Sequence, residues 1–236
     1  MSSHIEYPLS VRNLSYRYSK NQPEVLSNIS IDFPPHKITA IVGPNGSGKT
    51  TLLKHFNGLF LAQNGKVFVN GQVLNKKTRK TIQKQIGIVF QNPDEQIFYP
   101  KVVDDVAFGP RNMNLSITEI QERVAQAGKL AQISHLMDRI TFNLSFGEKK
   151  KVALAGILAM QPEILVLDEP TIGIDPWSKG HFISLISSFS PKKTVIVITH
   201  DFEIMKSVDY IVLIKDGEVK GKYFDFNSFY QEEFAS

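Results

Sequence analysis

The stretch Gly43-Pro44-Asn45-Gly46-Ser47-Gly48-Lys49-Thr50 decides the fold of this chain of 236 residues. It matches G-x-x-x-x-G-K-[ST] in full, the pattern of a phosphate-binding loop between a strand and a helix. The apolar, β-branched run from Lys37 to Val42 predicts the strand before it, and a helix is predicted from Lys49 to about Asn57. This context favours a nucleotide site over the alternative of an ordinary glycine-rich turn.

The residue types of this loop suit the terminal phosphates of a nucleotide. Glycines let backbone N–H groups turn inward, and the following helix directs its positive dipole end at the same phosphates. Lys49 supplies charge to the β- and γ-phosphates, and the Thr50 hydroxyl is suited to ligating Mg²⁺. The expected nucleotide-binding residues of the loop are Gly43, Pro44, Asn45, Gly46, Ser47, Gly48, Lys49, Thr50 and Thr51.

A second candidate site is the apolar run Ile164–Leu167, which ends in two acids, Asp168 and Glu169. A buried strand does not normally finish with adjacent carboxylates unless they meet water or a cation. Asp168 is therefore expected to hold Mg²⁺, and Glu169 to polarise the attacking water as general base. The alternative is that the pair marks a solvated strand end or caps the next helix.

The rest of the chain alternates between strand and helix patterns, which predicts an α/β fold with a mostly parallel sheet covered by helices. Residues 91 to about 142 differ, because Ile117, Ile120 and Val124 recur at helical spacing and indicate a helical insertion. A further helix, apolar nearly all round and hence buried, is predicted over Ser145–Met160. The other predicted strands are Ser27–Phe33, Lys66–Asn70, Ile86–Phe90, Thr194–Thr199 and Tyr210–Lys215.

Composition excludes several classes of protein. The chain is 42% hydrophobic and 21% charged, and it has no cysteine, so disulfides and thiolate metal sites are excluded. Its net charge is +4, but Lys and Arg are scattered, so no nucleic-acid partner is expected. Met1 to Pro8 shows no secretory signal, and no apolar run approaches the roughly 18 residues of a membrane span. A membrane role would need a separate membrane partner.

Leu144-Ser145-Phe146-Gly147-Glu148 resembles the LSGGQ signature of ABC ATPases. In the same segment, Ser145-x-x-Glu148 is a capping box for the buried helix, and the two interpretations are compatible. The resemblance implies ATP and Mg²⁺ as cofactors, with ATP held between two chains. Ser145 and Gly147 would then meet the γ-phosphate bound by a second ABC ATPase subunit, in a homodimer or a heterodimer.

Other segments resemble the same family. Gln91 is similar to the glutamine that touches Mg²⁺ and senses the transporter, and His200 to the switch histidine at the γ-phosphate. Gly173–Pro176 resembles the D-loop, and it also reads as an Asp N-cap followed by a first-turn proline. Tyr18 resembles the aromatic residue that stacks on adenine, with Tyr16 as its rival. The catalytic residues implied are Glu169, His200, Lys49 and Gln91, and the metal ligands implied are Thr50, Gln91 and Asp168.

The resemblance covers roughly residues 9 to 222 and implies a single ABC ATPase domain over residues 1–236. Its P-loop NTPase core would include an N-terminal antiparallel β subdomain and would comprise residues 1–90 and 162–222. A helical signature subdomain would occupy residues 91–161, and a helical C-terminal tail residues 223–236.

Phe90–Phe98 and Asp105–Pro110 resemble the ATPases of energy-coupling-factor importers, which take up cobalt, nickel or vitamins. The resemblance implies a transmembrane coupling component and a substrate-binding membrane component, with this chain peripheral on the cytoplasmic face of the cell membrane. Asp94 and Glu95 are candidates for contacting the coupling component, or else begin an ordinary polar helix. The alternatives are another class of ABC importer and a soluble, non-transport ABC ATPase.

The signature departs from the family pattern at two positions. Phe146 replaces a glycine, and Glu148 replaces the glutamine and places a negative charge near a phosphate site. The run Lys149–Lys151 is expected to offset that charge. A guanine-nucleotide protein is disfavoured, because no Asn-Lys-x-Asp sequence is present.

Overall fold

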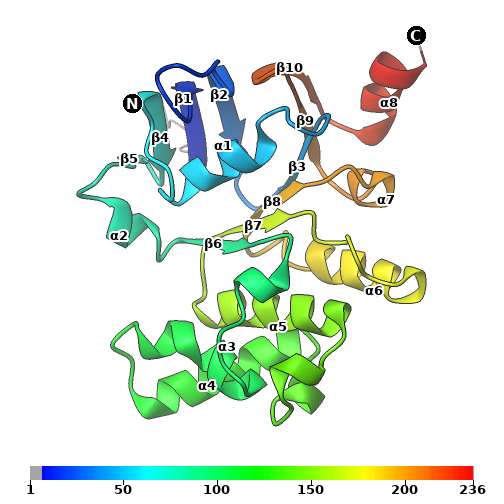
Figure 1. Cartoon of the computed structure of the whole chain (residues 1–236). Helices are drawn as coiled ribbons and strands as arrows, with labels where there is room; N and C mark the ends of the chain where they lie inside the picture. Colours follow the sequence, from blue (N-terminus) through cyan, green and yellow to red (C-terminus); the bar gives the residue numbers. More distant parts are fainter. Residues whose placement is uncertain (1–6, 236) are drawn as a thin grey trace, which may run out of the picture.

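Two β-sheets lie above a group of helices in the computed structural model, which describes residues 7–235 (Figure 1). The expectation for Met1 to Pro8 therefore falls mostly outside the described residues. Among the described residues, no helix combines the length and the apolar character needed to cross a bilayer.

The first sheet is antiparallel and has the order β2-β1-β4-β5. Its strands are β1 (Leu9–Tyr16), β2 (Leu26–Phe33), β4 (Asn64–Val69) and β5 (Gln72–Val73). Asn70 and Gly71 both have positive φ, at 45° and 75°, as the tight turn between β4 and β5 requires. The predicted N-terminal antiparallel sheet is confirmed, although sequence patterning had not identified β1.

The second sheet has the order β10-β9-β3-β8-β7-β6, and all its pairings are parallel except that of β10 with β9. The central strands β3 (Ile38–Val42), β7 (Ile164–Asp168) and β8 (Thr194–Ile198) are buried throughout. This burial on both faces explains why they appear in the sequence as continuous apolar runs. The remaining strands are β6 (Ile86–Val89), β9 (Tyr210–Lys215) and β10 (Glu218–Tyr223).

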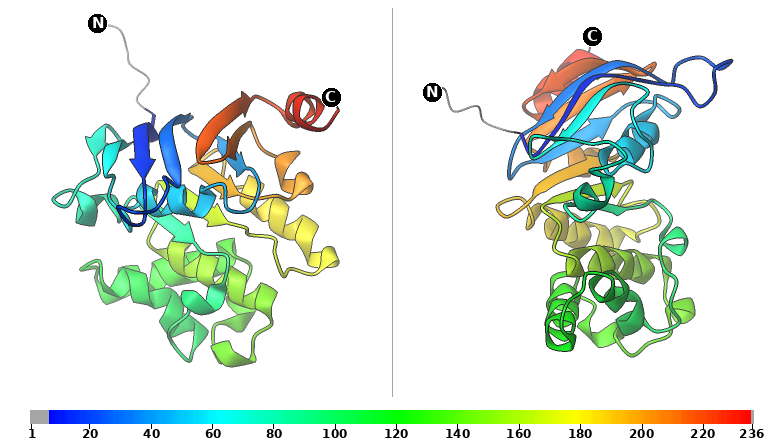
Figure 2. Two further views of the ribbon diagram at one scale, coloured as in Figure 1. Left: turned by 45° about the horizontal axis from the view of Figure 1, so that its top comes forward. Right: turned by 90° about the vertical axis from the view of Figure 1, so that its left-hand side faces the viewer.

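The second sheet separates two hydrophobic cores, because side chains alternate between its faces. On β8, Val195 and Val197 belong to the core on the helical side. Ile196 and Ile198 belong to the core beneath the antiparallel sheet, together with Leu52 and Phe56 of α1 (Lys49–Phe56). The sheet therefore separates α1 from the helical insertion, which lie on opposite faces of one layer (Figure 2).

The helical insertion consists mainly of α3 (Val102–Arg111), α4 (Ile117–Leu130) and α5 (Phe146–Ala159). Ser145 is the N-cap of α5 and Met160 its C-cap, so the predicted bounds differ from the helix only by its two caps. Short 3₁₀ turns lie at Pro93–Glu95, Ser134–Leu136 and Thr141–Asn143. The other helices are α2 (Arg79–Ile82), α6 (Pro176–Ser187), α7 (Phe202–Met205) and α8 (Phe226–Phe234). The predicted α/β class, with a mostly parallel sheet and a helical insertion, is confirmed.

Candidate functional site

A cavity of about 360 Å³ opens where strands β3, β7 and β8 end. The carboxyl ends of parallel strands are the usual location of ligand sites in such sheets. Most of the residues predicted for the nucleotide site meet here. The lining consists of Tyr18, Val25, Asn45, Gly46, Gly48, Lys49, Thr50, Thr51, Gln91, Asp168, Glu169 and Ile198.

The phosphate loop turns tightly between β3 and α1. Gly48 has φ 99°, and a Cβ placed on it would lie 2.8 Å from the carbonyl oxygen of Val25, so only glycine fits this position. As the N-cap of α1, Gly48 offers no side-chain acceptor to the first-turn N–H groups. Space beside Gly46 is open, with no atom within 4 Å of a Cβ built there. The free N–H groups of this helix start are therefore suited to an anion.

Lys49 is buried inside this loop, and its Nζ donates to the carbonyl oxygens of Gly43 and Pro44, each at 2.8 Å. Burial lowers the pKa of Lys49, while Glu169 and Asp168 act in the opposite direction. The ammonium is thus held beside two carboxylates by the backbone of its own loop.

Asp168 and Glu169 end strand β7 as two buried carboxylates side by side. Desolvation, followed by repulsion from Glu169, raises the pKa of Asp168 to about 6, and a hydrogen bond with the Thr50 side chain acts against the rise. Glu169 has φ 45°, an uncommon backbone conformation for a non-glycine residue that is typical of functional sites. A cation at this place would relieve the unfavourable pairing of the two carboxylates.

His200 follows β8 and brings its Nδ1 within 2.9 Å of Glu169 Oε1, in a hydrogen bond that the ring nitrogen donates to the carboxylate. The other carboxylate oxygen, Glu169 Oε2, is buried without a hydrogen-bond partner, and so is Ser47 Oγ. Buried polar atoms without partners are rare in proteins. Because Glu169 lines the cavity, its partnerless oxygen indicates a polar ligand there.

The three predicted metal ligands, Thr50, Gln91 and Asp168, line both this cavity and an adjoining one that Phe146 also lines. Among residues 7–235, no cluster of three or more His, Asp or Glu side chains is arranged to hold a metal unaided. Mg²⁺ usually takes one or two carboxylates and completes its shell with water and substrate phosphates. The carboxylate of Asp168, the hydroxyl of Thr50 and the amide of Gln91, beside a phosphate loop, fit this coordination preference.

The two tyrosines near the loop differ in environment. Tyr18 is 53% exposed, lines the cavity and shares a hydrogen bond of 2.8 Å with the Thr51 hydroxyl. The Tyr16 ring instead stacks on Phe60, with an interplanar angle of 11°, and packs against the core. Only Tyr18 is therefore placed to stack on a base in the cavity.

Ser145 and Gly147 line neither cavity and lie at the start of α5. The capping box is present, because Ser145 N donates to Glu148 Oε2 at 2.8 Å and Glu148 N donates to Ser145 Oγ at 3.3 Å. The surface beside Gly147 is open. These two residues therefore do not border the cavity of their own chain.

The expectation that Lys149–Lys151 offset the charge of Glu148 was wrong for the first two lysines. Lys149 pairs with Asp94 at 2.7 Å, and Glu148 instead pairs with Arg139 at 3.5 Å. Lys150 is buried and donates to the carbonyl oxygens of Glu169 and Pro170 at 2.7 and 3.1 Å. Successive residues on a helix point in different directions, so a run of like charges does not act on one neighbour.

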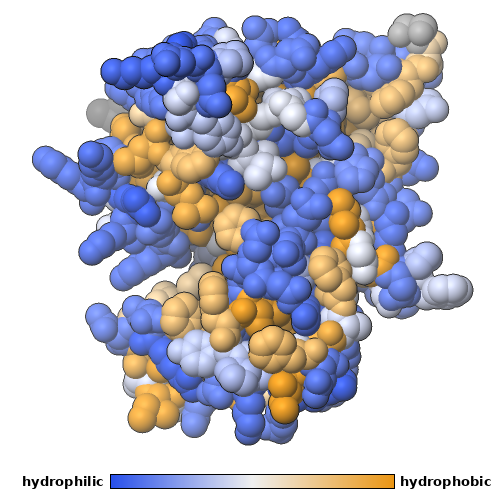
Figure 3. All heavy atoms as spheres, viewed as in Figure 1, coloured by the Kyte–Doolittle hydropathy of each residue, from blue (hydrophilic) through white to orange (hydrophobic). Residues whose placement is uncertain are grey.

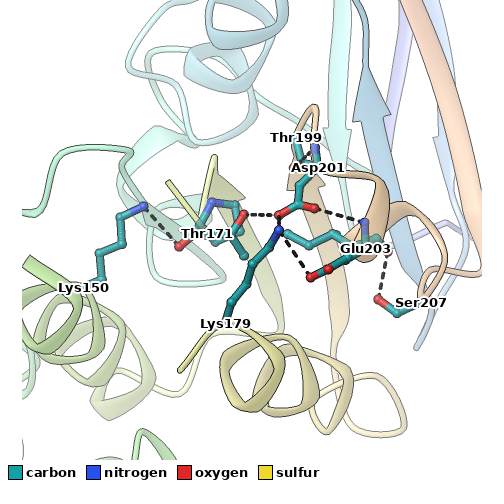
Figure 4. Close-up of polar contacts among 9 residues, drawn as sticks. Lys150, Thr171, Lys179, Thr199, Asp201, Glu203 and Ser207 are labelled. Carbon is teal, nitrogen blue, oxygen red and sulfur yellow. Dashed lines mark hydrogen bonds and ion pairs between the residues drawn. The ribbon is translucent and has the colours of Figure 1, made fainter. Parts of the chain in front are cut away.

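A polar network that no sequence pattern had indicated lies behind the site (Figure 4). Asp201 Oδ2 accepts a hydrogen bond of 2.7 Å from Thr171 Oγ1 and pairs with Lys179 Nζ at 2.8 Å. Lys179 also pairs with Glu203 at 3.3 Å. The network ties the segment after Glu169 to α6 and to the loop of His200. Thr171 and Asp201 lie 30 residues apart in the sequence, so no local pattern signalled their contact.

A larger groove of about 480 Å³ lies between α2 and the helices α3 and α5, and Figure 3 shows hydrophobic side chains around this hollow. Phe98, Phe108, Ile157 and Met160 contribute to its apolar lining. Asp94 and Glu95, the predicted partner contacts, do not line this groove; Asp94 lines another cavity of about 360 Å³, and Glu95 lines one of about 520 Å³.

Comparisons with known proteins agree with this geometry. The family described as ABC transporter matches residues 26–172. The chain is 42% identical over 212 residues to the energy-coupling factor transporter ATP-binding protein EcfA1 of Methanospirillum hungatei JF-1, with 89% of this chain and 76% of that protein covered. The solved structure of cbiO1 from Clostridium perfringens, part of the ABC transporter complex cbiONQ, matches with a TM-score of 0.87 and 37% identity, covering 97% of this chain and 92% of that one. A dimeric, post-hydrolysis structure of the ATP-binding cassette MJ0796 bound to ADP and Pi matches with a TM-score of 0.82 and 25% identity, over 92% of this chain and 98% of that one.

Proposed function

This chain belongs to the ABC transporter family and is an ABC ATPase, and from that premise we propose that it powers an energy-coupling-factor importer for cobalt, nickel or a vitamin. The observation that carries the proposal is the convergence of Lys49, Thr50, Asp168 and Glu169 on one cavity beside the phosphate loop. The likeness to EcfA1 and to cbiO1 supports the importer type.

The phosphate loop binds the β- and γ-phosphates of ATP through its backbone N–H groups and the Lys49 ammonium. Thr50, Gln91 and Asp168 would hold Mg²⁺, which neutralises charge on the phosphates when bound. Glu169 accepts a proton from the attacking water, and its partnerless Oε2 is the atom free to do so. His200 orients Glu169 through its hydrogen bond and reaches the γ-phosphate.

The base and ribose of ATP extend from the loop toward Tyr18, whose exposed ring stacks on adenine. Lys49, Gln91, Glu169 and His200 make up the catalytic set. Because phosphoryl transfer depends on positioning and charge stabilisation rather than covalent catalysis, this small set is sufficient.

A second ABC ATPase subunit completes each site by placing the start of its α5 over the bound γ-phosphate. Ser145 and Gly147 form this surface, and their distance from the chain's own cavity supports the arrangement. The helix start offers N–H groups and a positive dipole end to the anion. ATP binding closes such a dimer, and hydrolysis reopens it.

The membrane part is supplied by separate coupling and substrate-binding components, and this chain lies peripherally on the cytoplasmic face of the cell membrane. The apolar groove between α2 and the helices α3 and α5 is the surface suited to the coupling component. In this arrangement, the core of residues 1–90 and 162–222 holds the nucleotide. The helical subdomain of residues 91–161 meets the membrane partner, and residues 223–236 form a C-terminal tail.

The decisive test replaces the proposed general base. Glu169→Gln keeps the size and the hydrogen bonding of the side chain but removes the proton acceptor, so we expect Mg-dependent ATP affinity within about threefold of wild type and turnover lower by about 10³-fold or more. Lys49→Ala is the matched control, which should lose affinity as well. Turnover retained in Glu169→Gln would exclude Glu169 as the base.

Co-purification tests the transport role. Membrane proteins recovered with the tagged chain would support an importer, and transport assays with reconstituted partners would then distinguish cobalt, nickel or vitamins from the substrates of other ABC importers. Recovery of nucleic acid or ribosomes instead would favour a soluble, non-transport ABC ATPase.

A further inference from the structure

The aromatic residue that replaces a glycine in the signature is packed within its own chain. Phe146 begins α5, and a Cβ built on Gly173 would lie 2.5 Å from Phe146 Cδ1, so the ring rests directly on the D-loop (residues 173–176). Gly173 has φ 75° and leaves the space that the ring occupies. The start of α5 and the D-loop are therefore in direct contact.

The same ring lies beneath a buried ammonium. Lys150 Nζ is 5.5 Å from the centre of the Phe146 ring, one helical turn along α5. Lys150, labelled in Figure 4, is only 2% exposed. Its Nζ donates to the carbonyl oxygens of Glu169 and Pro170. A buried ammonium must keep its acceptors, so Lys150 ties α5 firmly to the backbone that carries the catalytic carboxylate.

We propose that Phe146 and Lys150 are positioning residues that join the signature, the D-loop and the Glu169 turn of one chain into a single mechanical unit. The proposal rests on the head-to-tail dimer of the proposed function. There, the start of α5 meets the nucleotide of the partner subunit, while Glu169 acts on the chain's own nucleotide. A shift of α5 on contact with the partner's γ-phosphate is transmitted through Phe146 and Lys150 to Glu169, so each ATP site prepares the other.

Two features of the contact favour a role in transmitting movement between the two ATP sites over a role in packing alone. Phe146 is 37% exposed and lines the cavity that Thr50, Gln91 and Asp168 share, so it lies between the signature and the predicted metal ligands. Lys150 contacts the carbonyl oxygen of Glu169 itself, so displacing its ammonium alters the turn in which Glu169 has φ 45°. Coupling between sites needs an element that both sites bias, and this unit touches both.

The chain contains its own reporter for the test. Trp177 is the single tryptophan of the sequence, directly follows the D-loop and is 86% exposed. The measurements are ATP affinity by equilibrium dialysis, turnover as a function of ATP concentration, and Trp177 emission during nucleotide binding. The variants are Phe146→Gly, which restores the family residue, Phe146→Tyr, which keeps the ring, and Lys150→Met, which keeps the length of the side chain without its ammonium.

We expect Phe146→Gly and Lys150→Met to lower kcat about tenfold, with KM for ATP within twofold and the Hill coefficient reduced toward one. The Trp177 response to ATP should shrink in the same two variants, and Phe146→Tyr should restore every readout. Circular dichroism and thermal melting identify a variant that fails to fold, and the other variant then decides the outcome.

Wild-type kcat, Hill coefficient and Trp177 response in a folded Phe146→Gly or Lys150→Met protein would overturn the coupling while leaving the proposed ATPase intact. A wild-type protein that binds no Mg-ATP would instead contradict the proposed function itself. Equal loss of activity in Phe146→Tyr and Phe146→Gly would also overturn the proposal, because the ring would then not be the transmitting group.

Discussion

Helices α4 and α5 begin with the same device and serve different purposes. Each has 14 residues and starts with a Ser-x-x-Glu capping box, formed by Ser116 and Glu119 in α4 and by Ser145 and Glu148 in α5. The bond from the serine N–H to the glutamate measures 3.0 Å in α4 and 2.8 Å in α5. The local chemistry thus fixes where each helix starts, but it does not distinguish a structural cap from a functional one.

The surroundings make the difference. α4 buries one side through Val124, Ala127 and Gly128, and its first turn is largely exposed. Half of the α5 residues are buried, and its first two turns touch the D-loop and the Glu169 turn through Phe146 and Lys150. A capping box therefore acquires a function only when its helix start is placed against a catalytic segment.

The strongest way to break this comparison is to add the same charge to both caps. Aspartate can still accept from the first-turn N–H, but it replaces a serine hydroxyl that donates to the cap glutamate at 2.7 Å in α4 and 2.9 Å in α5, so Ser116→Asp and Ser145→Asp should each lower the free energy of unfolding by a similar amount, about 1 kcal/mol. Only Ser145→Asp would face the partner's γ-phosphate. Like charges about 4 Å apart near a protein surface repel by about 4 kcal/mol, so we expect ATPase activity to fall at least about 100-fold. Activity preserved in Ser145→Asp would show that no phosphate reaches the start of α5.

Removing each cap gives a smaller effect. Ser116→Ala and Ser145→Ala should each lower the free energy of unfolding by about 1 kcal/mol, because one first-turn N–H loses its acceptor. We expect turnover to drop about tenfold in Ser145→Ala, equivalent to one lost hydrogen bond to a charged group, and to stay unchanged in Ser116→Ala. Urea unfolding and steady-state ATPase assays measure the two quantities. Equal turnover in both variants would make the two caps equivalent.

Neutralising the glutamates sharpens the comparison further. Hydrogen bonding within the caps lowers the pKa of both Glu119 and Glu148, so the stability they give is present above the ordinary value of 4.5 and is lost as the pH falls through the lower folded-state value. Glutamine keeps the capping box without this acid dependence. Glu148→Gln should in addition raise ATPase activity about threefold, because it removes a negative charge near a phosphate site. This increase corresponds to an electrostatic free energy of about 0.7 kcal/mol. Glu119→Gln is the control, and an equal rise there would argue against that cause.

The third helix of the insertion offers the smallest effect. α3 has no side-chain N-cap, but Asp105 Oδ1 accepts from the N–H groups of Phe98 and Tyr99 at 2.8 and 3.0 Å. Burial raises the pKa of Asp105, so its contribution to stability is largest below the ordinary value of 3.8 and declines as the pH rises through the folded-state value. Asp105→Asn can keep both bonds without the buried charge.

At pH 7 the melting temperature of Asp105→Asn should match that of wild type or exceed it by about 2–4 °C, which corresponds to about 1 kcal/mol. The gap should close toward pH 4. Asp105→Ala, the control, leaves two N–H groups without an acceptor and should melt lower than both. A lower melting temperature for Asp105→Asn than for wild type at pH 7 would show that the carboxylate charge itself stabilises α3.

The features predicted from sequence are those decided within a few residues. The strand before Gly43, the helix after Lys49 and the capping box at Ser145 depend on backbone chemistry that neighbouring side chains supply. The Asp175 N-cap followed by Pro176 was recognised for the same reason. The structure of such motifs is determined by residues close together in the sequence. For this reason the nucleotide loop could be placed before the fold was known.

Features that depend on distant partners could not be read from the sequence. The alternation that makes β2 a strand says nothing about β1 as its neighbour, and Tyr16 and Tyr18 differ only through Phe60, which the fold brings beneath one of them. Lys150 was assigned to Glu148, close in sequence, whereas its acceptor lies on Glu169, 19 residues away. Sequence spacing identifies candidates, but three-dimensional packing selects among them.

The side chains of β8 alternate between two hydrophobic cores, and this arrangement affects how the protein unfolds. Val195 and Val197 anchor one core and Ile196 and Ile198 the other, so the same backbone supports both. Loss of the helices from one face would expose the strands that support the nucleotide loop. Loss of the packing on the other face would expose the same strands, which also support the helices. We therefore expect the two halves to unfold together as one cooperative unit.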